Sequence, residues 1–320
     1  MFRFINRFIN KLKRWYRHRQ LVKQGILTPI ESYEQYTGLV KDIKANSTQK
    51  VFTNCYVMPA EVKRLISLGA LYKLKTNCGL AFADDEGSYY YLFLYTDMSQ
   101  PLELPAVEKD ILVEDVYYDG RQTDAQIQFE AYVQDSGCIF LNKYNAITDR
   151  PQISPERYWK QLSALEKALA AEGKKICQPE DGQLKQFERI YRKNINKYVQ
   201  KKYGKKERKK QRDLGYLHCV ADDKGDLYAI HISGLLHGGA IAARKDCQGS
   251  VYSPALMLYI WKGFYEAMPE DEGTRKEYMR SRSIGGWIAV DNKHSWRMHK
   301  ALGFKAAGKS MNQFVLKSAM

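Results

Sequence analysis

The segment from residue 284 to residue 304, IGGWIAVDNKHSWRMHKALGF, constrains the fold of this chain more than any other part of the sequence. Aromatic and branched residues from 287 to 290 favour a strand, and residues 291–292 supply a turn or a helix N-cap. Apolar side chains then recur at helical spacing up to Leu302, and Gly303 ends the helix. We therefore expect a strand, a tight turn, a short amphipathic helix and a further extended run.

The pattern N-x-x-S-x-R-M-H-K-A-L-G-F in this segment resembles the closing motif of the GNAT superfamily of acyl-CoA N-acyltransferases, which runs roughly N-x-x-A/S-x-x-L-Y/H-x-x-L-G-F. In that family the strand lies beside acyl-CoA, and the helix carries a residue near the thioester sulfur. Within that superfamily the segment resembles the phosphinothricin-type acetyltransferases, which also have His at this position of the helix. The alternative is an ordinary strand, turn and helix that ends at Gly. The matching positions are Asn292, Ser295, Met298, His299, Leu302, Gly303 and Phe304.

Length and composition allow a globular enzyme of two domains. A chain of 320 residues is long for one hydrophobic core, and 44% hydrophobic residues exclude a disordered chain. The six Cys residues form no C-x-x-C pair, so neither a zinc ribbon nor a disulfide framework is predicted. No apolar run approaches the roughly 20 residues that cross a bilayer, and the N-terminus lacks the apolar core of a secretory signal. We expect a cytoplasmic protein, either free or peripheral at a membrane.

Two segments create the whole excess of positive charge, which is +15 at pH 7. Residues 1–30 hold eight basic side chains and no acid, and residues 174–212 hold fifteen basic against four acidic side chains. The first segment has an apolar helical stripe, which is typical of a helix on a membrane or an anionic partner, and equally of a helix docked on its own core. The second segment predicts binding to RNA or cofactor phosphates, with a solvated helix end as the alternative.

One order of elements occurs twice along the chain, around the turns DDEG and DDKG, so we predict two copies of one fold. This gives an α/β protein of two tandem GNAT-like domains, each a mixed central sheet flanked by helices. The predicted regions are a basic amphipathic helical region at 1–50, a degenerate GNAT-like domain at 51–150, a connecting helix at 151–173 and the acyltransferase domain at 174–320. The expected elements are helix 59–68, strands 71–83, 89–96 and 110–118, helix 124–134, strand 138–147, helices 155–172 and 182–203, strands 215–221, 226–236 and 239–244, helix 252–268 and strand 284–290.

The tandem arrangement also resembles the Fem-type aminoacyltransferases. That resemblance rests on the order of elements and implies a different donor, aminoacyl-tRNA, which a basic surface would suit. A third alternative is a binding module without catalytic activity, whose basic helices dock on nucleic acid or membrane. The sequence therefore leaves three hypotheses open: an acyl-CoA transferase, a tRNA-dependent transferase and a binding module.

Cofactor binding in the GNAT superfamily uses a loop of the pattern Q/R-x-x-G-x-G/A, whose amides meet the pyrophosphate of CoA at a helix N-terminus. Here RKDCQG at 244–249 keeps the first Arg and the last Gly, and Cys247 stands at the middle Gly. A Cys in that place would have to adopt a backbone that Gly adopts more cheaply. Ser253-Pro254 predicts the start of the next helix. The resemblance implies acetyl-CoA or another acyl-CoA as substrate, held by Arg244, Cys247, Gly249, Val290, Asn292 and Ser295; the alternative is a plain loop into a core helix.

Amide formation from a thioester needs a neutral amine, oxyanion stabilisation and a proton for the leaving thiolate. His299 is the candidate proton donor, with packing or capping as the alternative. His231 is the candidate base because it shares one strand face with Ser233, with a structural His as the alternative. No metal site is predicted, since the His residues show no ligand spacing with Cys or carboxylates. We expect direct transfer to an amine acceptor whose identity the sequence leaves open.

Overall fold

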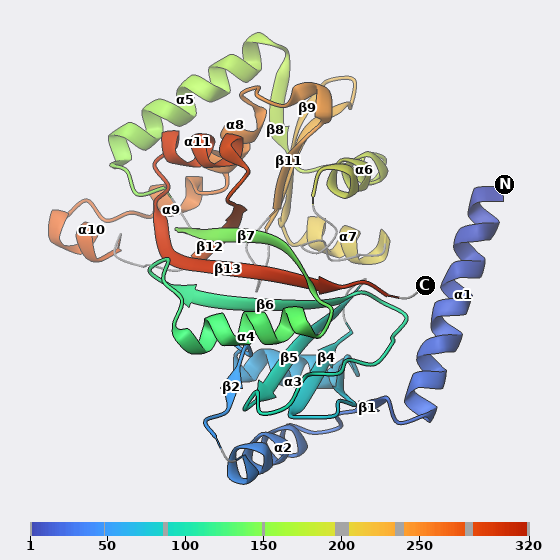
Figure 1. Cartoon of the computed structure of the whole chain (residues 1–320). Helices are drawn as coiled ribbons and strands as arrows, with labels where there is room; N and C mark the ends of the chain where they lie inside the picture. The colour runs from blue at the N-terminus through green and yellow to red at the C-terminus, as the bar shows by residue number, and fades with distance from the viewer. Residues whose placement is uncertain are drawn as a thin grey trace. The chain divides into compact units, whose positions relative to one another are not determined.

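The computed structural model describes residues 2–47, 49–85, 89–148, 151–195, 205–233, 240–278 and 284–318. The described chain is a mixed α/β protein, in which helices flank a mixed sheet (Figure 1). It divides into two compact units, unit 1 (Met1–Lys143 with Ser310–Met320) and unit 2 (Tyr144–Lys309). The predicted α/β class is therefore confirmed. The predicted domain bounds and the degenerate character of the N-terminal copy stay predictions.

Unit 1 is built on strands in the order β1-β3-β4-β5-β6-β13, with β2 paired to β5. Strand β5 pairs in parallel with β6 and antiparallel with β4, so the sheet is mixed. Strands β7 and β13 each continue from one unit into the other. The elements are α1 (Phe2–Lys23), β1 (Leu27–Pro29), α2 (Tyr33–Asn46), β2 (Phe52–Thr53), α3 (Pro59–Ser67), β3 (Leu71–Leu74), β4 (Leu80–Asp84), β5 (Tyr90–Thr96), β6 (Ile111–Tyr118), α4 (Asp124–Asp135), β7 (Ile139–Thr148) and β13 (Ala306–Leu316).

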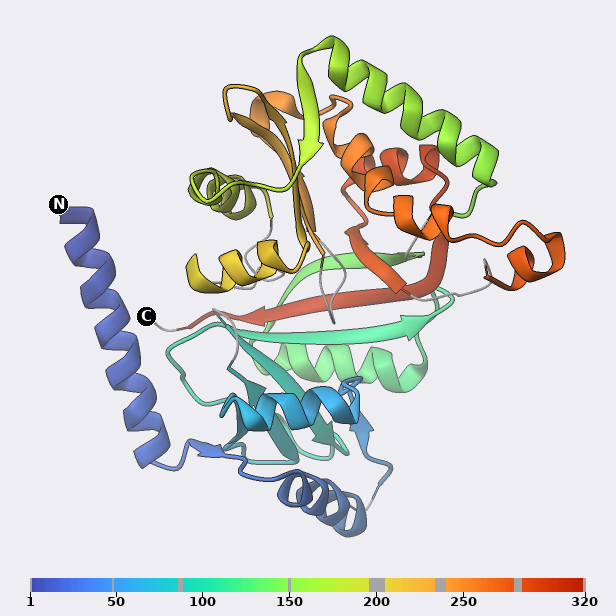
Figure 2. The ribbon, with the colours of Figure 1, turned by 180° about the vertical axis from the view of Figure 1, so that it is seen from behind.

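Alternation along the strands of unit 1 supplies two cores. On one face Leu92 and Ala81 pack with Phe129 of α4, and on the other face Phe82 packs with Leu65 of α3. Neighbouring residues of a strand point to opposite faces, so a run such as β4 is buried on both sides. Helices thus cover both faces of this sheet, which is visible from behind in Figure 2.

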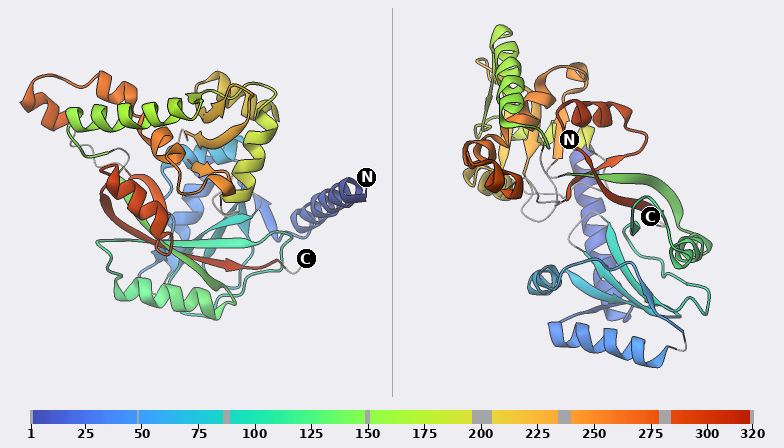
Figure 3. Two further views of the ribbon diagram at one scale, coloured as in Figure 1. Left: turned by 90° about the horizontal axis from the view of Figure 1, so that it is seen from above. Right: turned by 90° about the vertical axis from the view of Figure 1, so that its left-hand side faces the viewer.

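Unit 2 contains a four-stranded antiparallel sheet in the order β11-β10-β9-β8, and a second pairing in which β12 lies antiparallel to β7. Figure 3 shows the helices of this unit from two further sides. The elements are α5 (Pro155–Ala171), β8 (Lys174–Cys177), α6 (Leu184–Asn194), α7 (Lys205–Asp213), β9 (Leu217–Asp222), β10 (Leu227–Ile232), β11 (Ala240–Ala243), the 3₁₀ turn η1 (Lys245–Cys247), α8 (Tyr252–Tyr259), α9 (Lys262–Glu266), α10 (Glu272–Tyr278), β12 (Ile284–Ala289) and α11 (Lys293–Ala301).

Each face of the four-stranded sheet has its own helix. Phe187 of α6 packs with Ile230 on one face, and Leu256 of α8 packs with Val220 on the other. Burying one such side chain stabilises the fold by about 2–3 kcal/mol. Strands β11 and β12 are end strands of different sheets, and Ile241 and Ile288 contribute to one hydrophobic cluster. The segments that follow these two strands, η1 with α8 and the turn into α11, carry most of the predicted site.

Several predicted boundaries are wrong, and each error has a local cause. The predicted strand 71–83 is two antiparallel strands, because the chain turns back at residues 75–79, where Gly79 adopts φ +65°. The predicted helix 182–203 ends at Asn194, and a second helix, α7, follows. The predicted helix 252–268 is divided into α8 and α9. The start of the predicted strand 239–244 lies outside the described residues.

Candidate active site and cofactor loop

The predicted strand, turn and helix at 284–304 are confirmed, and local signals explain them. The side chain of Asn292 caps α11, since its Oδ1 accepts a hydrogen bond from the Ser295 amide at 3.1 Å. At the other end the Phe304 amide donates to the His299 carbonyl at 2.9 Å. Gly303 between them adopts φ +90°, and a Cβ there would lie 2.2 Å from Cγ2 of Ile153. Both the backbone conformation and the packing therefore require Gly at this position.

His299 lies buried on the inner side of α11. Its side chain is 5% exposed, and its ring meets the Phe304 ring edge-on at 5.2 Å. Its Nδ1 is 2.7 Å from the Ser295 carbonyl oxygen, to which the neutral ring donates, so Nε2 carries the lone pair. Burial lowers the pKa of His299, although the hydrogen bond to Ser295 opposes this shift. At neutral pH the ring is thus an acceptor that has to gain a proton before it can give one.

The remaining predicted residues of this segment lie at the solvent-facing end of β12. Ile288 is buried in the core of unit 2, whereas Val290, one residue beyond the end of the strand, is 44% exposed. Asn292 is also exposed. The Ser295 hydroxyl lies 3.3 Å from Nδ1 of His299. Asn292, Ser295 and His299 therefore form one cluster along a single helix.

The loop at 244–251 reaches α8 through η1. Among the described residues other than Gly, positive φ occurs only at Met98 and Asp119, so Cys247 carries no strain of the predicted kind. The left-handed residue is Gly249, with φ +86°. Helix α8 begins at Tyr252, as predicted for the helix at 252–268, and Ser253-Pro254 lie in its first turn and not at its N-cap.

The N-terminus of α8 presents unpartnered donors. The amides of Gly249, Val251 and Ser253 have no hydrogen-bond partner among the described residues, whereas the Tyr252 amide between them donates to Ser250 Oγ at 3.4 Å. The first amides of a helix lack intrahelical acceptors and favour anions there. This end of α8 is therefore chemically suited to a phosphate group.

Two cations and two Tyr rings lie next to this loop. The Arg244 guanidinium is 4.7 Å from the Tyr228 ring centre, and Lys174 Nζ is 4.6 Å from Tyr228 and 4.9 Å from Tyr252. Arg244 Nε also bonds Asp246 at 2.7 Å, and Lys174 bonds Glu172 at 2.6 Å. An incoming phosphate would have to compete with these carboxylates for both cations.

Lys174, Tyr228 and Tyr252 were missed by the sequence analysis. The period-2 alternation of a regular strand predicts Tyr228 on the same face as Ile230, and that prediction is wrong. A bulge between Leu227 and Ala229 moves Tyr228 to the α8 side, where its ring lies 5.6 Å from Tyr252. A one-residue irregularity of this kind breaks the two-residue alternation on which such an assignment depends.

His231 lies buried on the α8 face of β10, directly opposite His218 on β9. The two ring centres are 6.2 Å apart, and the His218 ring lies 5.7 Å from that of Tyr259. Nδ1 of each His has no partner among the described residues. Burial, with a smaller contribution from His218, lowers the pKa of His231 to about 3, and burial also lowers the pKa of His218. A base this weak is neutral at pH 7 and suits hydrogen-bond acceptance better than proton abstraction.

The structure thus groups the predicted residues into three local clusters: the α11 cluster, the loop with Arg244, and the His218–His231 pair. In the described part of the chain, no recorded contact joins one cluster to another. His218 was missed because nothing in the sequence pairs position 218 with position 231. His237, for which the neighbouring Gly238-Gly239 predicts a role in a turn, lies outside the described residues. No group of three or more His, Cys, Asp or Glu side chains that could hold a metal is present within the described ranges.

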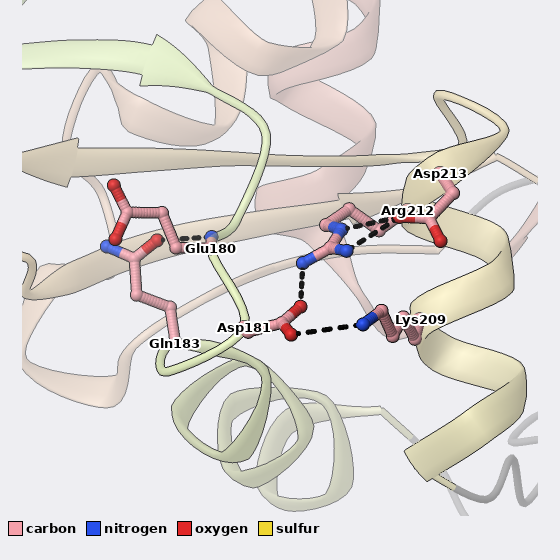
Figure 4. Close-up of polar contacts among 6 residues, drawn as sticks. All are labelled: Glu180, Asp181, Gln183, Lys209, Arg212 and Asp213. Atoms are coloured by element: carbon pink, nitrogen blue, oxygen red, sulfur yellow. Dashed lines mark hydrogen bonds and ion pairs between the residues drawn. The ribbon is translucent and has the colours of Figure 1, made fainter.

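Much of the second basic segment is already paired with carboxylates. Figure 4 shows Asp181 accepting hydrogen bonds from Lys209, at 3.3 Å, and from Arg212, which also binds Asp213 at 2.6 Å. The same view shows the Glu180 amide donating to Gln183. Arg192 and Arg208 share Glu188 in the same way. Among the residues of this segment whose side chains are described, Lys185, Arg189, Lys193 and Lys210 have no carboxylate partner.

Helix α1 is docked on unit 1 through its C-terminal part alone, as far as its side chains are described. Leu21 is buried in the core, and His18 Nδ1 lies 3.2 Å from Oε1 of Glu108. Leu12, Trp15 and Tyr16 are 49%, 55% and 62% exposed. The prediction of a helix docked on its own core is therefore confirmed for its C-terminal part, and the prediction of a membrane or anionic partner stays a prediction. Within the described residues, no helix combines the length and the apolar character that a membrane span requires.

No protein-family profile matches the sequence, and no curated protein matches it. Solved structures similar to this chain include a GNAT-family acetyltransferase from Colwellia psychrerythraea, with 13% identity over 91% of this chain and 99% of that one, at a TM-score of 0.45. A tandem GNAT protein from the clavulanic acid biosynthesis pathway has 10% identity over 92% and 98% of the chains, at 0.48. A GCN5-related N-acetyltransferase-like protein from Streptococcus suis has 10% identity over 87% and 93%, at 0.41. Because these TM-scores lie below 0.5, the likeness by itself establishes neither family nor activity.

Proposed function

We propose that unit 2 is an N-acyltransferase that moves an acyl group, in the first instance acetyl, from acyl-CoA directly to an amine. The observation that carries the proposal is the N-terminus of α8, where unpartnered amides and a nearby Arg follow the end strand β11. The second support is the GNAT-like motif, since α11 has the capped and Gly-terminated geometry that its pattern predicts.

The pyrophosphate of CoA is proposed to lie against the amides of Gly249, Val251 and Ser253. Arg244 supplies a charged donor. The Cys247 amide already donates to the Arg244 carbonyl at 2.8 Å, so Cys247 shapes the 3₁₀ turn without donating to the phosphate. A charge-assisted hydrogen bond from Arg to phosphate is stronger than a neutral one. Because Arg244 also binds Asp246, the gain on binding phosphate is reduced by the loss of that ion pair.

The exposed end of β12 and the start of α11 are proposed to bind the rest of the donor. Val290 would contact the pantetheine arm through its exposed side chain, and Asn292 and Ser295 would face the thioester end. The side-chain nitrogen Nδ2 of Asn292 remains able to donate, because the cap uses only the side-chain oxygen Oδ1.

The proposed chemistry is aminolysis of the thioester. The amine nitrogen forms a bond to the acyl carbon, the tetrahedral intermediate loses a proton to a base, and the carbon–sulfur bond breaks to release the thiolate, which takes up a proton. His299 is neutral and has a free Nε2, so we assign it both transfers: it takes the proton from the nitrogen and passes it to the sulfur. His231, whose pKa is about 3, is assigned the accepting of a hydrogen bond from the amine.

The test is thermal unfolding of the purified chain with acetyl-CoA, with ATP as the control for nonspecific anion binding. A ligand that binds only the folded state raises its stability in proportion to the logarithm of concentration over Kd. A concentration-dependent rise with acetyl-CoA but not with ATP supports the proposal, and thiol release in the presence of a panel of amines then identifies the acceptor class. No rise, or an equal rise with ATP, contradicts it and makes aminoacyl-tRNA the next donor to test.

For the first basic segment we propose an anionic membrane surface as the partner. Leu12, Trp15 and Tyr16 are exposed, and residues 1–30 carry eight basic side chains and no acid. Aromatic and basic residues on one helix suit the boundary between lipid headgroups and acyl chains. At a membrane the basic charge, the two aromatic rings and the aliphatic Leu12 side chain are all used.

A further inference from the structure

Two cysteines of unit 2 lie directly opposite each other on neighbouring strands. In the antiparallel pairing of β8 with β9, the register sets Cys177 against Cys219. Their sulfur atoms are 3.6 Å apart. Directly opposed residues of antiparallel strands have Cα atoms about 4.5–5.5 Å apart, which lies within the range that a disulfide spans. Closing the bond requires the sulfur atoms to approach to about 2.05 Å, so local side-chain rotation suffices.

The two thiols differ in access. Cys219 is fully buried in the core beneath α6, whereas Cys177, the last residue of β8, is half-buried. Lys175, two residues before Cys177 on the same strand, adds a positive charge nearby, and the hydrogen bond from Cys219 lowers the pKa of Cys177 to about 7. The hydrogen bond with Cys177 and, after it, burial raise the pKa of Cys219. One sulfur is therefore accessible and nucleophilic, and the other is shielded.

We propose that Cys177 and Cys219 are a redox-active pair that forms a reversible intrachain disulfide by exchange with a small disulfide such as oxidised glutathione. Cys177 is the attacking thiol, and Cys219 is the resolving thiol. The inference does not depend on the proposed acyltransferase activity.

The exchange balances in two steps. The Cys177 thiolate attacks one sulfur of oxidised glutathione, the glutathione disulfide bond breaks, and a glutathione thiolate leaves while a mixed disulfide forms on Cys177. The Cys219 sulfur then attacks Cys177 Sγ, and the second glutathione leaves as the thiolate and takes up the proton that Cys219 loses. In total two protein thiols are oxidised, and one glutathione disulfide is reduced to two glutathione thiols.

Geometry distinguishes this pair from the other four cysteines. Cys78, also half-buried, has Tyr132 as its close sulfur neighbour at 2.9 Å, and no thiol is recorded beside it within the described chain. It therefore serves as a matched control for accessibility without a resolving partner. On exposure to the same oxidant, Cys78 can stop only at the mixed disulfide.

The experiment equilibrates the full chain in glutathione buffers of stepped potential, blocks remaining thiols with iodoacetamide and maps the peptides by mass. The expected result is one intrachain link, between the peptides of Cys177 and Cys219, at a protein concentration low enough to exclude chain-to-chain links. The other four cysteines are expected either alkylated or carrying one glutathione, and in no intrachain link. In Cys219→Ser the expected product is glutathione held on Cys177, and in Cys177→Ser it is an unmodified Cys219. Cys78→Ser should leave the linked pair unchanged.

The wild-type map decides the matter even if a variant fails to fold. Alkylation of both Cys177 and Cys219 in the most oxidising buffer would overturn the proposal, as would a link from either residue to another cysteine. Absence of glutathione on Cys177 in a folded Cys219→Ser protein would overturn the assignment of the attacking thiol.

Discussion

Replacing Gly303 by Ala tests whether the end of α11 is held by backbone conformation alone or also by close packing. Gly303 has φ +90°, and an added Cβ would lie 2.2 Å from Cγ2 of Ile153. The left-handed backbone costs an L-residue about 1–2 kcal/mol, and forcing a methyl group into a filled site costs about 1–3 kcal/mol more. We therefore expect Gly303→Ala to lower the free energy of unfolding by about 2–5 kcal/mol in total.

Gly173 supplies the matched control. It follows α5 as Gly303 follows α11, its φ is +65°, and an added Cβ would meet nothing within 4 Å. Gly173→Ala should therefore show the conformational cost alone, about 1–2 kcal/mol. The measurement is urea unfolding monitored by circular dichroism. The comparison requires that the variants share one slope of the free energy of unfolding against urea concentration.

A double-mutant cycle isolates the packing contribution. Ile153→Ala removes the methyl group that an alanine at 303 would meet, at the cost of a cavity worth about 2–5 kcal/mol in an otherwise normal core. In the Gly303→Ala background the same change should cost less by about 1 kcal/mol or more, because the introduced methyl group fills part of the space. Equal losses for Gly303→Ala and Gly173→Ala, together with strict additivity in the cycle, would refute the packing argument and leave only the backbone conformation.

Four further predictions follow from the site and from the two units. Arg244→Ala should weaken acetyl-CoA binding, measured by calorimetry, about tenfold, which is a loss of about 1.4 kcal/mol. The control Lys185→Ala removes a cation without a carboxylate partner elsewhere in unit 2 and should leave Kd unchanged. Equal losses of affinity in the two variants would indicate a general charge effect. His299→Ala should lower kcat tenfold or more at unchanged Kd for acetyl-CoA. In the wild type, kcat/KM should fall toward acid pH as His299 becomes protonated below its lowered pKa, and this fall should disappear in the variant. An unaltered pH profile would show that His299 takes no part in the proton transfer. Burial, with a contribution from Glu130, raises the pKa of Asp115 to about 7, so the folded state binds more protons than the unfolded state between about pH 4 and pH 7. The free energy of unfolding should therefore fall as pH rises through that window, and Asp115→Asn should flatten the fall. An unchanged slope of free energy against pH in the variant would contradict the raised pKa. Replacing the exposed Leu12 and Trp15 by Ser should reduce co-sedimentation with phosphatidylglycerol vesicles about tenfold, while binding to neutral vesicles stays at background. Equal binding of the wild type and the variant to phosphatidylglycerol vesicles would contradict the membrane proposal.

Local chemistry explains what the sequence predicted well. The helix cap at Asn292 and the stop at Gly303 both act within a few residues, so the sequence alone reveals them. The helices at 59–67 and 124–135 were predicted to within one residue at each end for the same reason. Here the local signals and the tertiary structure agree.

The failures concern features that depend on contacts distant in sequence or on a single irregular residue. The pairing of His218 with His231 and of Cys177 with Cys219 arises from strand register, which the residues themselves do not reveal. The bulge that turns Tyr228 toward α8 is a one-residue shift with no compositional signal. Helix α6 stops at Asn194 although basic helix-forming residues continue beyond it, because Ile195 adopts an extended backbone.

The cofactor loop shows why a departure from a motif has to be judged by conformation. Cys247 stands where the GNAT pattern has Gly, yet it ends a 3₁₀ turn with an ordinary backbone, and the left-handed step is made two residues later by Gly249. The substitution therefore costs the loop little, and it gives no physical reason to expect loss of anion binding. A stronger obstacle is the ion pair between Arg244 and Asp246, since a phosphate must replace a carboxylate that is already 2.7 Å from the guanidinium. If this loop binds CoA as proposed, competition for the Arg244 side chain would limit the affinity more than the missing Gly does.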